Sequence, residues 1–529
     1  MPHYFATIIL VVASGLWIAR YLRNTVSPSF SAIPNAHFTA PYSRFWLRWI
    51  KLTGREHHAR NAAHKRLGSV IRIAPQELSV NCIKDGVQTI YSSAFEKTIW
   101  YSGFKNYGQS FMFSMAANKP HSERKRMLAH VYSKTHIQNS MTLNSILDTM
   151  LLKRFIPQMR EWAKEGCVVN VNLENKALFM DVITAYLFGL ENGTNFIQNP
   201  EEKVLLRKFE SFTYGLFWAS EFPGLLVSIN RLRESILGDL VRYYRVTERL
   251  GLTNLIHQLR IPVLADTARC YKSVETFVLD LCQRAKDRMS PSAMGHSSHL
   301  TVYSSFRERL EESQTVPSDL LDVTIAGELL DEIQAAHEPT GITLAFLMWE
   351  LSRHPEACAR LQRELDTLGT VRSAQAIDNL PFTDALLKET MRLYPAGLGP
   401  FPRCVPEKGA VVDGFDLAPG TIVSSSAYAL HRHPGVFPEP ENWTPSRWID
   451  ATAERKNEMA KWFWAFGSGS RMCIGSHLAS RIIKAALVAI YSEYDTFTAN
   501  SNKVQQIDSL IGTPVDNEIM LRVAKRAQT

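Results

Sequence analysis

The chain has 529 residues, of which 45% are hydrophobic and 21% are charged. These proportions are typical of a folded globular protein and exclude a wholly disordered chain or a fibrous repeat. The 59 Lys and Arg against 51 Asp and Glu leave a net charge of +8, which suits an anionic membrane surface or an acidic protein partner. The sequence has no dense stripe of Lys and Arg interleaved with aromatic residues, so we expect no nucleic-acid binding.

The N-terminus carries an uncharged, apolar run over residues 4–19, and Arg20 and Arg23 follow it directly. This length is close to the minimum for a membrane-spanning helix. A cleaved signal peptide is the alternative, but it would have basic residues before the apolar run, where this chain has only His3. Basic residues after the run predict that the rest of the chain lies in the cytosol. We therefore predict a single-pass anchor over residues 1–22, a Pro- and Ser-containing hinge over 23–40, and a globular body over 41–529.

The body is expected to be mainly α-helical with small β-sheets. Two short β-rich runs around a proline, residues 70–74 and 78–80, predict a hairpin. Residues 214–227 are apolar but interrupted by a proline and a glycine, so they belong either to the core or to a second membrane-touching surface. Residues 289–298 are rich in Ser, Pro and Gly and predict a loop. Apolar side chains at three- and four-residue steps predict a long helix within 316–353.

Seven cysteines are spread widely along the chain, without any C-x-x-C pair. This spacing argues against a zinc ribbon or a thioredoxin-type site, and a disulfide scaffold is not expected in so long a chain. We expect reduced thiols, most of them buried as small apolar side chains. The seven are Cys82, Cys167, Cys270, Cys282, Cys358, Cys404 and Cys473.

Cys473 differs from the others because it stands in a glycine-rich segment, residues 466–475, just before a helical pattern that begins at His477. Glycines let a backbone bend sharply and approach a large flat group. Backbone amides and a helix N-terminus favour a thiolate, which is a ligand for iron. The alternative is a glycine-rich turn that holds an inert cysteine.

The wider pattern favours the iron ligand. Residues 466–475 match F-x-x-G-x-R-x-C-x-G, the haem-binding motif of the cytochrome P450 family, and the chain resembles that family over nearly its full length. Glu389 and Arg392 match the E-x-x-R motif of the family, and residues 443–448 (WTPSRW) resemble its F-x-P-x-R-F segment. The resemblance implies a P450-like fold, preceded here by the N-terminal transmembrane helix. It also implies that Arg447 joins Glu389 and Arg392 in a structural charge cluster.

The same resemblance assigns the cofactor site. Cys473 would be the proximal thiolate ligand of haem iron, a ligand whose electron donation favours O–O bond cleavage. Phe466 and Gly475 of the motif would also contact the cofactor. The haem propionates need basic partners, and the candidates are Arg471, Arg403, His121 and Lys125. The last two stand where the family often has W-x-x-x-R, and neither residue matches that form.

Arg124 is a close alternative to Lys125 as a propionate partner. Residues 121–126 (HSERKR) can also be interpreted as a basic helix face that docks an acidic reductase, and the two roles are compatible.

The long helix departs from the family at residues 335–340 (AAHEPT), where the family has A-G-x-D/E-T-T. The acid falls on Glu338, but Pro339 replaces the threonine usually held to manage the proton for O–O cleavage. Proline removes its own N–H and frees the carbonyl of Ala335, which favours a kink and a groove for water. Thr340 lies about 100° round the helix, and Thr343 lies one turn further on the same face as Pro339. Either hydroxyl could order a water through which Glu338 relays protons.

Two reaction types follow from this departure. In the first, proton delivery through Glu338 and Thr340 survives, and the enzyme hydroxylates or epoxidises its substrate. In the second, delivery is weakened, and the enzyme couples phenols, desaturates or closes rings without oxygen insertion. We favour the first because an acid is retained. A haem-thiolate sensor is the alternative from another class, but the sequence shows no recognisable output domain.

The resemblance also implies the partners of the enzyme. Dioxygen and a lipophilic small molecule would be its substrates, and NADPH-cytochrome P450 reductase would supply electrons, with cytochrome b5 as an additional donor. The body would face the cytosol from the endoplasmic reticulum membrane. The segments around residues 64–81 and 95–108 resemble those of filamentous-fungal members, which indicates a role in secondary-metabolite biosynthesis. Substrate contacts are expected from residues 95–115, 209–227, 335–336 and 396–400.

Overall fold

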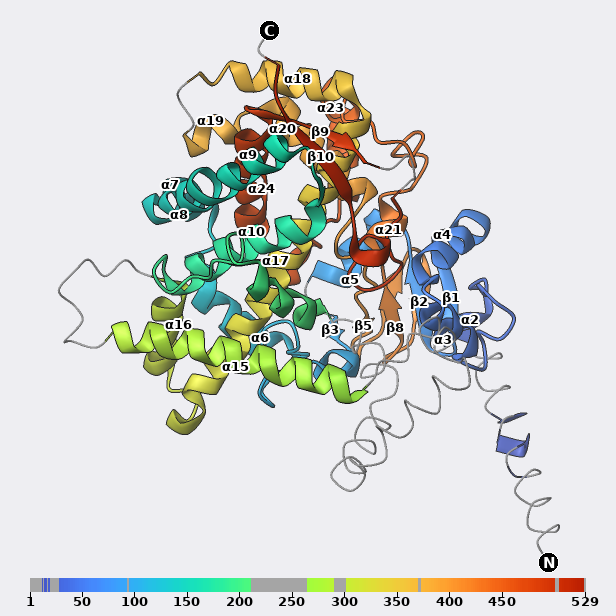
Figure 1. The fold of residues 1–529 in the computed structure, drawn as a ribbon. Coiled ribbons are helices and arrows are strands. Elements are labelled where there is room, and N and C mark those ends of the chain that lie inside the picture. Colours follow the sequence, from blue (N-terminus) through green and yellow to red (C-terminus); the bar gives the residue numbers. More distant parts are fainter. Residues whose placement is uncertain are drawn as a thin grey trace, which may run out of the picture.

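The computed structural model describes residues 28–92, 95–210, 264–289, 301–369, 373–499 and 504–527, and nearer the N-terminus residues 12, 14–16 and 18–19. Helices make up most of this part of the chain; a five-stranded sheet lies to one side of them, and strands β9 (Tyr494–Thr498) and β10 (Met520–Lys525) lie among them (Figure 1). The prediction of a mainly α-helical body with small β-sheets is therefore confirmed.

The helices before the long central helix are α2 (Pro28–Ser31), α3 (Phe45–Leu52), α4 (Glu56–Leu67), α5 (Gln88–Ser92), α6 (Asn118–Leu128), α7 (Lys134–Asn139), α8 (Met141–Leu147), α9 (Ile156–Glu165), α10 (Val171–Phe188), α15 (Leu264–Arg288) and α16 (Val302–Ser313). Of these, α10, α15 and α16 pack against the central helix. Shorter 3-10 or π turns lie at Ile83–Val87, Ile99–Gly103, Asp148–Phe155 and Pro200–Lys203.

The second group of helices begins with the central one. It comprises α17 (Leu321–Arg353), α18 (Pro355–Asp366), α19 (Ala374–Asp378), α20 (Pro381–Leu393), α21 (Ala427–Leu430), α22 (Arg447–Asp450), α23 (Ala453–Trp462) and α24 (Ser476–Tyr491). Further 3-10 turns lie at Ser318–Leu320, Gly469–Arg471 and Val515–Asn517.

The largest sheet has five strands in the order β1-β2-β8-β5-β3: β1 (Val70–Ala74), β2 (Glu77–Val80), β8 (Ile422–Ser424), β5 (Arg403–Cys404) and β3 (Glu96–Lys97). The β1–β2 pair is antiparallel, with Val70 opposite Val80, so the predicted hairpin is confirmed. The β2–β8 pair is parallel, and the remaining pairs are antiparallel. A three-stranded sheet contains β4 (Val168–Asn170), β10 (Met520–Lys525) and β9 (Tyr494–Thr498), and a two-stranded one contains β6 (Ala410–Val412) and β7 (Phe415–Leu417).

Helix α17 runs through the middle of the molecule, with α10 packed against it (Figure 1). The predicted long helix is confirmed, but it begins at Leu321 because a 3-10 turn follows Pro317. The two helices approach closely at Gly341, where an added Cβ would lie 2.9 Å from the backbone nitrogen of Lys176. Glycine at this position therefore sets the crossing that fixes α17 in the core.

The N-terminal part of the body packs on the five-stranded sheet. Within the predicted hinge, residues 28–40 are described, and Phe30 and Ile33 are buried there. The backbone amide of Arg72 in β1 donates to the carbonyl of Pro34 at 2.8 Å, so this segment is fastened to the sheet edge. The predicted anchor lies almost wholly outside the described residues. None of the described helices combines the length and the apolar character that a membrane crossing requires.

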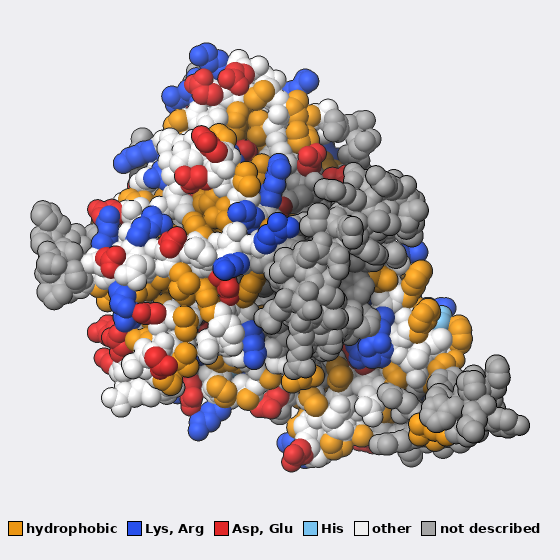
Figure 2. Space-filling view, turned by 60° about the horizontal axis from the view of Figure 1, so that its bottom comes forward, with side chains coloured by type: hydrophobic (Ala, Val, Ile, Leu, Met, Phe, Trp, Pro, Cys, Tyr) orange, Lys and Arg blue, Asp and Glu red, His pale blue; other side chains and the backbone are white. Residues whose placement is uncertain are grey.

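Two other predictions lie outside the described residues. These are the apolar segment 214–227 and the loop-like segment from residue 290 to 298. On the face shown in Figure 2, basic, acidic and hydrophobic side chains are interspersed, so the described part of this face has no continuous field of one sign.

Candidate active site

The segment before α24 folds into a tight loop around Cys473. Gly467 and Gly469 both have φ of +68°, a conformation that favours glycine. An added Cβ on Gly469 would lie 1.9 Å from the carbonyl oxygen of Tyr91 in α5, so only glycine fits between loop and helix. The amide of Cys473 donates to the carbonyl of Phe466 at 2.9 Å and closes the loop.

Cys473 combines an accessible side chain with a position deep in the protein. All seven cysteines lie in the described part of the chain, all are free thiols, and Cys473 is the exposed one among them. Burial among the surrounding chain raises the pKa of its thiol, whereas the Gly475 N–H and the Lys125 ammonium act in the opposite direction. Because α24 begins at Ser476, the sulfur also lies beside a helix N-terminus. An accessible thiol inside a fold marks a recess above it.

Glu389 and Arg392 of α20 form a buried ion pair with two parallel hydrogen bonds of 2.8 and 2.9 Å. The Arg447 Nε joins them at 3.0 Å from Glu389 Oε1, so the structure brings the three predicted cluster residues together. Burial alone would raise the pKa of Glu389, but the hydrogen bonds and charges of Arg392 and Arg447 outweigh it and hold that pKa below its ordinary value.

Two residues that the sequence analysis missed complete this cluster. Trp448 donates its indole N–H to Glu389 Oε2 at 2.9 Å. His431 is fully buried, with Nδ1 3.1 Å from the Arg392 carbonyl, and its Nε2 accepts from the Trp464 amide at 2.7 Å. Burial, and then the charges of Arg392 and Arg432, lower the pKa of His431 to about 3, so the ring is neutral. His431 thereby connects the E-x-x-R helix to the start of the cysteine loop.

A group of cations surrounds the other side of the loop. Lys97 in β3 and Arg403 in β5 lie directly opposite one another in an antiparallel pair, and both are buried. Like charges in such positions destabilise a sheet unless an anion neutralises them. His121 of α6 is also buried, and its Nδ1 has no hydrogen-bond partner in the described part of the chain. Burial, and then the charges of Arg471 and Lys97, lower its pKa to about 3.

Arg471 and Lys125 join the cysteine loop to the chain around α6. Arg471 donates to the carbonyls of Met115 and Ala116 at 2.8 and 2.9 Å. The Lys125 ammonium donates to the carbonyls of Ser470 and Met472 at 3.0 and 2.8 Å. Of the four predicted propionate partners, these two therefore also hold the loop in place.

Arg124, the alternative to Lys125, points elsewhere. It pairs with Glu328 of α17 at 2.8 Å, and both side chains are buried. Lys97 is a propionate candidate that the sequence analysis missed. No local spacing pointed to it, because β3 meets β5 and α6 only in the folded chain.

On helix α17, one stripe of side chains is accessible although the helix is otherwise buried from Thr324 to Leu351. The stripe consists of Asp331, Gln334, Ala335, Ala336 and Pro339. Asp331, Ala335 and Pro339 are four residues apart and so share one face of the helix. Asp331 is also close enough to Cys473 for its charge to raise the pKa of that thiol. The stripe therefore borders the recess above Cys473.

The two predicted catalytic residues are less accessible than this stripe. Glu338 is buried, and its Oε1 lies 3.7 Å from the ammonium of Lys176 in α10. Thr340 is buried and donates its hydroxyl to the Ala336 carbonyl at 2.5 Å. Thr343 donates in the same way to the carbonyl of Pro339 at 2.8 Å. In this conformation both hydroxyl protons are engaged within the helix, and each oxygen remains able to accept from water.

These residues fit a haem-thiolate cofactor. An accessible thiol lies at a helix N-terminus, and a glycine-rich loop leaves space for a flat ring. Buried cations lie around His121, whose Nδ1 has no partner among the described residues, and such a group suits two carboxylates. His121 and Arg403, together with Lys97, would hold the propionates, and Cys473 would bind the iron.

A comparison with protein families settles the relationship. A family model described as Cytochrome P450 matches residues 41–521. The chain belongs to the cytochrome P450 family. The resemblance inferred from the sequence is thus confirmed, and membership implies a haem cofactor bound through an axial cysteine thiolate. It also implies dioxygen, a small-molecule substrate and a redox partner.

Curated relatives agree with this assignment. The chain is 26% identical to the cytochrome P450 monooxygenase hkm5 of Aspergillus hancockii over 448 residues, which cover 82% of this chain and 78% of the relative. It is also 26% identical to the cytochrome P450 monooxygenase avaI of Aspergillus versicolor, with 79% and 93% covered. For the cytochrome P450 monooxygenase penB of Penicillium thymicola the identity is 25%, with 81% and 89% covered. The chain is accordingly an oxidoreductase of the P450 monooxygenase type.

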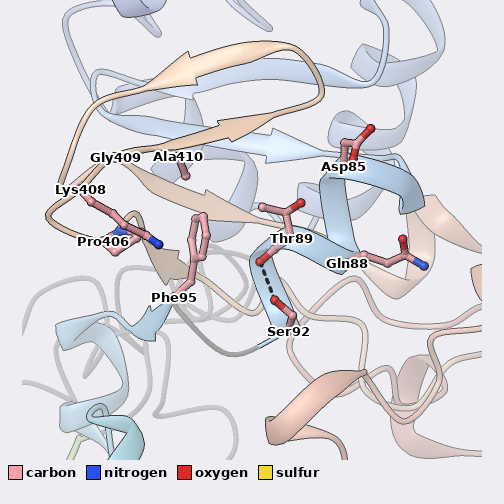
Figure 3. A pocket seen from close by; sticks show the side chains of 9 residues that line it. All are labelled: Asp85, Gln88, Thr89, Ser92, Phe95, Pro406, Lys408, Gly409 and Ala410. Carbon is pink, nitrogen blue, oxygen red and sulfur yellow. Dashed lines mark hydrogen bonds between the residues drawn. The ribbon is translucent and has the colours of Figure 1, made fainter.

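A separate surface pocket is not part of this site. It lies between α5 and the loop before β6, and its lining includes Asp85, Gln88, Phe95 and Lys408 (Figure 3). It contains none of the predicted catalytic, cofactor-binding or cluster residues, and Phe95 is the one member of the predicted substrate-contact ranges that lines it.

Proposed function

We propose that this P450 inserts one oxygen atom of dioxygen into a lipophilic small molecule, with Cys473 as the axial ligand. The observation that carries the proposal is the accessible Cys473 thiol at the N-terminus of α24, below the accessible stripe of α17. Bound haem would supply dioxygen activation with electrons delivered one at a time. The apolar Ala335, Ala336 and Pro339 would face the substrate and exclude bulk water.

Proton delivery is the task of the α17 residues. Pro339 has no N–H, so the carbonyl of Ala335 lacks its usual helical donor and can accept from a water. Glu338 would relay the proton, because a carboxylate can accept one from such a water and release it again; its Oε1 lies 3.7 Å from Lys176. The retention of an acid at this position supports oxygen insertion. Coupling, desaturation or ring closure is the second reaction type, and the engaged hydroxyls of Thr340 and Thr343 support it.

Isotope labelling tests which reaction occurs. Purified enzyme with a reductase would convert a substrate under ¹⁸O-labelled dioxygen, and mass spectrometry would examine the product. We expect one labelled oxygen atom in the product. A product that gains no label, formed while the substrate loses hydrogen, would establish the second type.

We also propose that electrons come from an NADPH-cytochrome P450 reductase, with cytochrome b5 as an additional donor. Support comes from α6, where Lys119 and Arg126 are exposed and Lys125 contacts the cysteine loop. A basic surface close to the axial ligand suits an acidic flavoprotein. Replacing Lys119 and Arg126 by Glu should slow reduction by the reductase but not by dithionite. Equal slowing with both reductants would reject this surface.

The membrane association is likewise a proposal. We infer that residues 1–22 anchor the protein in the endoplasmic reticulum membrane, that 23–40 connect the anchor to the body, and that 41–529 face the cytosol. Helix α3 supports it, because Phe45 and Trp49 are 66% and 52% exposed beside Arg48 and Lys51. Full-length protein should resist extraction by alkaline carbonate, whereas a variant without residues 1–22 should be released. Release of both would refute the anchor.

The proposed substrate class rests on the accessible apolar residues Ala335, Ala336 and Pro339 and on the fungal resemblance. Both support a lipophilic intermediate of secondary metabolism. Deleting the gene in its host and comparing extracts by mass spectrometry would test this role, and an unchanged metabolite profile would argue against it.

A further inference from the structure

Asp331 is an acid on the helix that borders the recess above Cys473. In the part of the chain that the structure describes, no hydrogen bond or ion pair involves its carboxylate. Its side chain belongs to the accessible stripe of α17, together with Ala335 and Pro339. Burial, and then the charge of Glu328, raise the pKa of Asp331 well above its ordinary value. The ionised form of such an acid is stabilised most by a ligand that brings an opposite charge.

The neighbouring acids show that the absence of a partner is specific to Asp331. Glu328 pairs with Arg124 at 2.8 Å and accepts from the amide of Met112 at 3.0 Å. Glu332 accepts from the hydroxyl of Tyr132. Both therefore have structural partners inside the protein, although they stand within three residues of Asp331.

The cation whose charge acts on Asp331, Lys97, already has other partners. Lys97 influences Asp331 electrostatically but makes no ion pair with it within 4 Å in the described chain. Its ammonium donates to the carbonyl of Phe113 and lies over the rings of Tyr101 and Phe113. Lys97 also belongs to the cation group that would neutralise the propionates. Asp331 is thus left as the ionisable group of the stripe, beside apolar Ala335, Ala336 and Pro339.

We propose that Asp331 is the polar anchor of the substrate pocket and that it selects lipophilic substrates carrying a positively charged nitrogen. This inference rests on the proposed function, because the recess above Cys473 is then the substrate pocket. An uncompensated carboxylate in a poorly solvated recess is costly, and a cationic ligand removes that cost. The apolar residues of the stripe would contact the remainder of the ligand. The position of Asp331 along α17 would fix which end of the substrate lies towards Cys473.

The test compares two ligands of the same shape on the haem-loaded enzyme. One is 4-phenylbutyl-trimethylammonium, whose nitrogen has no lone pair and cannot bind iron. The other is its neutral analogue, with carbon in place of nitrogen. Equilibrium dialysis gives both dissociation constants. We expect the wild type to bind the cation at least about tenfold more tightly, the size expected for a contact with a charged group. Asp331→Asn should abolish this preference and leave the affinity for the neutral ligand unchanged.

Glu332→Gln is the matched control, because it removes an adjacent acid that faces Tyr132, and the preference should persist. A wild-type enzyme without preference overturns the proposal by itself, and so does a preference that survives in Asp331→Asn. The wild-type comparison therefore tests the proposal even if the Asp331→Asn variant fails to load haem. The proposed function is examined separately by the spectrum of the reduced enzyme under carbon monoxide. A missing thiolate band would reject that function, whatever the ligand preference.

Discussion

The two sides of the site differ in how their charges are paired. One side lies below the cysteine loop, and the other is formed by α17. Below the loop, Glu389 accepts five hydrogen bonds, all between 2.8 and 3.0 Å, from two arginines, an indole and a backbone amide. On α17, the accessible stripe contains three apolar side chains, Gln334 and Asp331, whose carboxylate has no partner among the residues that the structure describes. The first side is rigid because every charge is satisfied several times. The second side leaves room for a ligand to supply the missing interactions.

The largest effect is expected at the ligand itself. Cys473→Ala should abolish the strongly red-shifted absorption band of the reduced protein under carbon monoxide, because no other exposed thiol exists among the seven described cysteines. Cys358→Ala is the control, since Cys358 is buried near Asp495 and should leave the band unchanged. A wild-type band without the thiolate shift, or a Cys473→Ala protein that keeps it, would remove Cys473 from its role.

The rigid side should respond next most strongly. Glu389→Ala leaves Arg392 and Arg447 without their shared acid, and breaking a buried pair costs about 3–5 kcal/mol. The free energy of unfolding, measured in denaturant, should fall by this amount.

The adjacent Lys388→Ala variant serves as the control for Glu389→Ala. It removes a half-exposed pair with Asp384 and should cost less than about 1 kcal/mol. Similar losses in both variants would contradict the contrast between a rigid cluster and an ordinary helix surface.

Two glycines of the cysteine loop separate conformational strain from steric contact. Gly467→Ala should cost about 1–2 kcal/mol, because φ is +68° but no atom lies within 4 Å of the new Cβ. Gly469→Ala has the same φ and also meets the carbonyl of Tyr91, so it should lose more stability and release haem faster. Equal haem-release rates would show that α5 moves away without cost.

Acid should weaken the rigid side through His431. Its pKa is about 3 in the folded protein and 6.5 in the unfolded reference, so the unfolded chain binds more protons between these values. Stability should therefore fall as the pH drops from about 6.5 towards 3, by at most about 1.4 kcal/mol per pH unit from this residue. Denaturant unfolding at several pH values should show a shallower slope for His431→Asn. Identical slopes would exclude His431 as a source of acid sensitivity.

The smallest effect on stability is expected on α17. Thr340→Ala removes one intrahelical hydrogen bond and should change the free energy of unfolding by less than about 1 kcal/mol. If Thr340 participates in proton delivery, the fraction of NADPH consumption that yields product should nevertheless fall. The same measurement on Thr343→Ala shows which of the two hydroxyls participates in proton delivery. Unchanged coupling in Thr340→Ala would remove Thr340 from the relay.

The sequence predicted the features that depend on neighbouring residues. The loop around Cys473, the Glu389–Arg392 spacing and the long helix are local patterns, and the 70–80 hairpin is set by a short turn. The cation group could not be found in this way, because β3, β5 and α6 bring Lys97, Arg403 and His121 together from distant segments. Asp331 was missed for another reason. An acid on a helix becomes informative only when the surrounding structure is known, and here no residue of the described ranges pairs with Asp331.

The facing pair of Lys97 and Arg403 links the amount of folded protein in the cell to the supply of an anion. An anion that binds between these strands stabilises the folded chain and not the unfolded one, so it shifts the folding equilibrium by mass action. The supply of haem would then determine how stably each newly made molecule folds. Chains that obtain haem would be more stable, and those that do not would be more readily degraded by proteases. The steady-state amount of this enzyme should therefore follow haem synthesis even when its messenger RNA is constant.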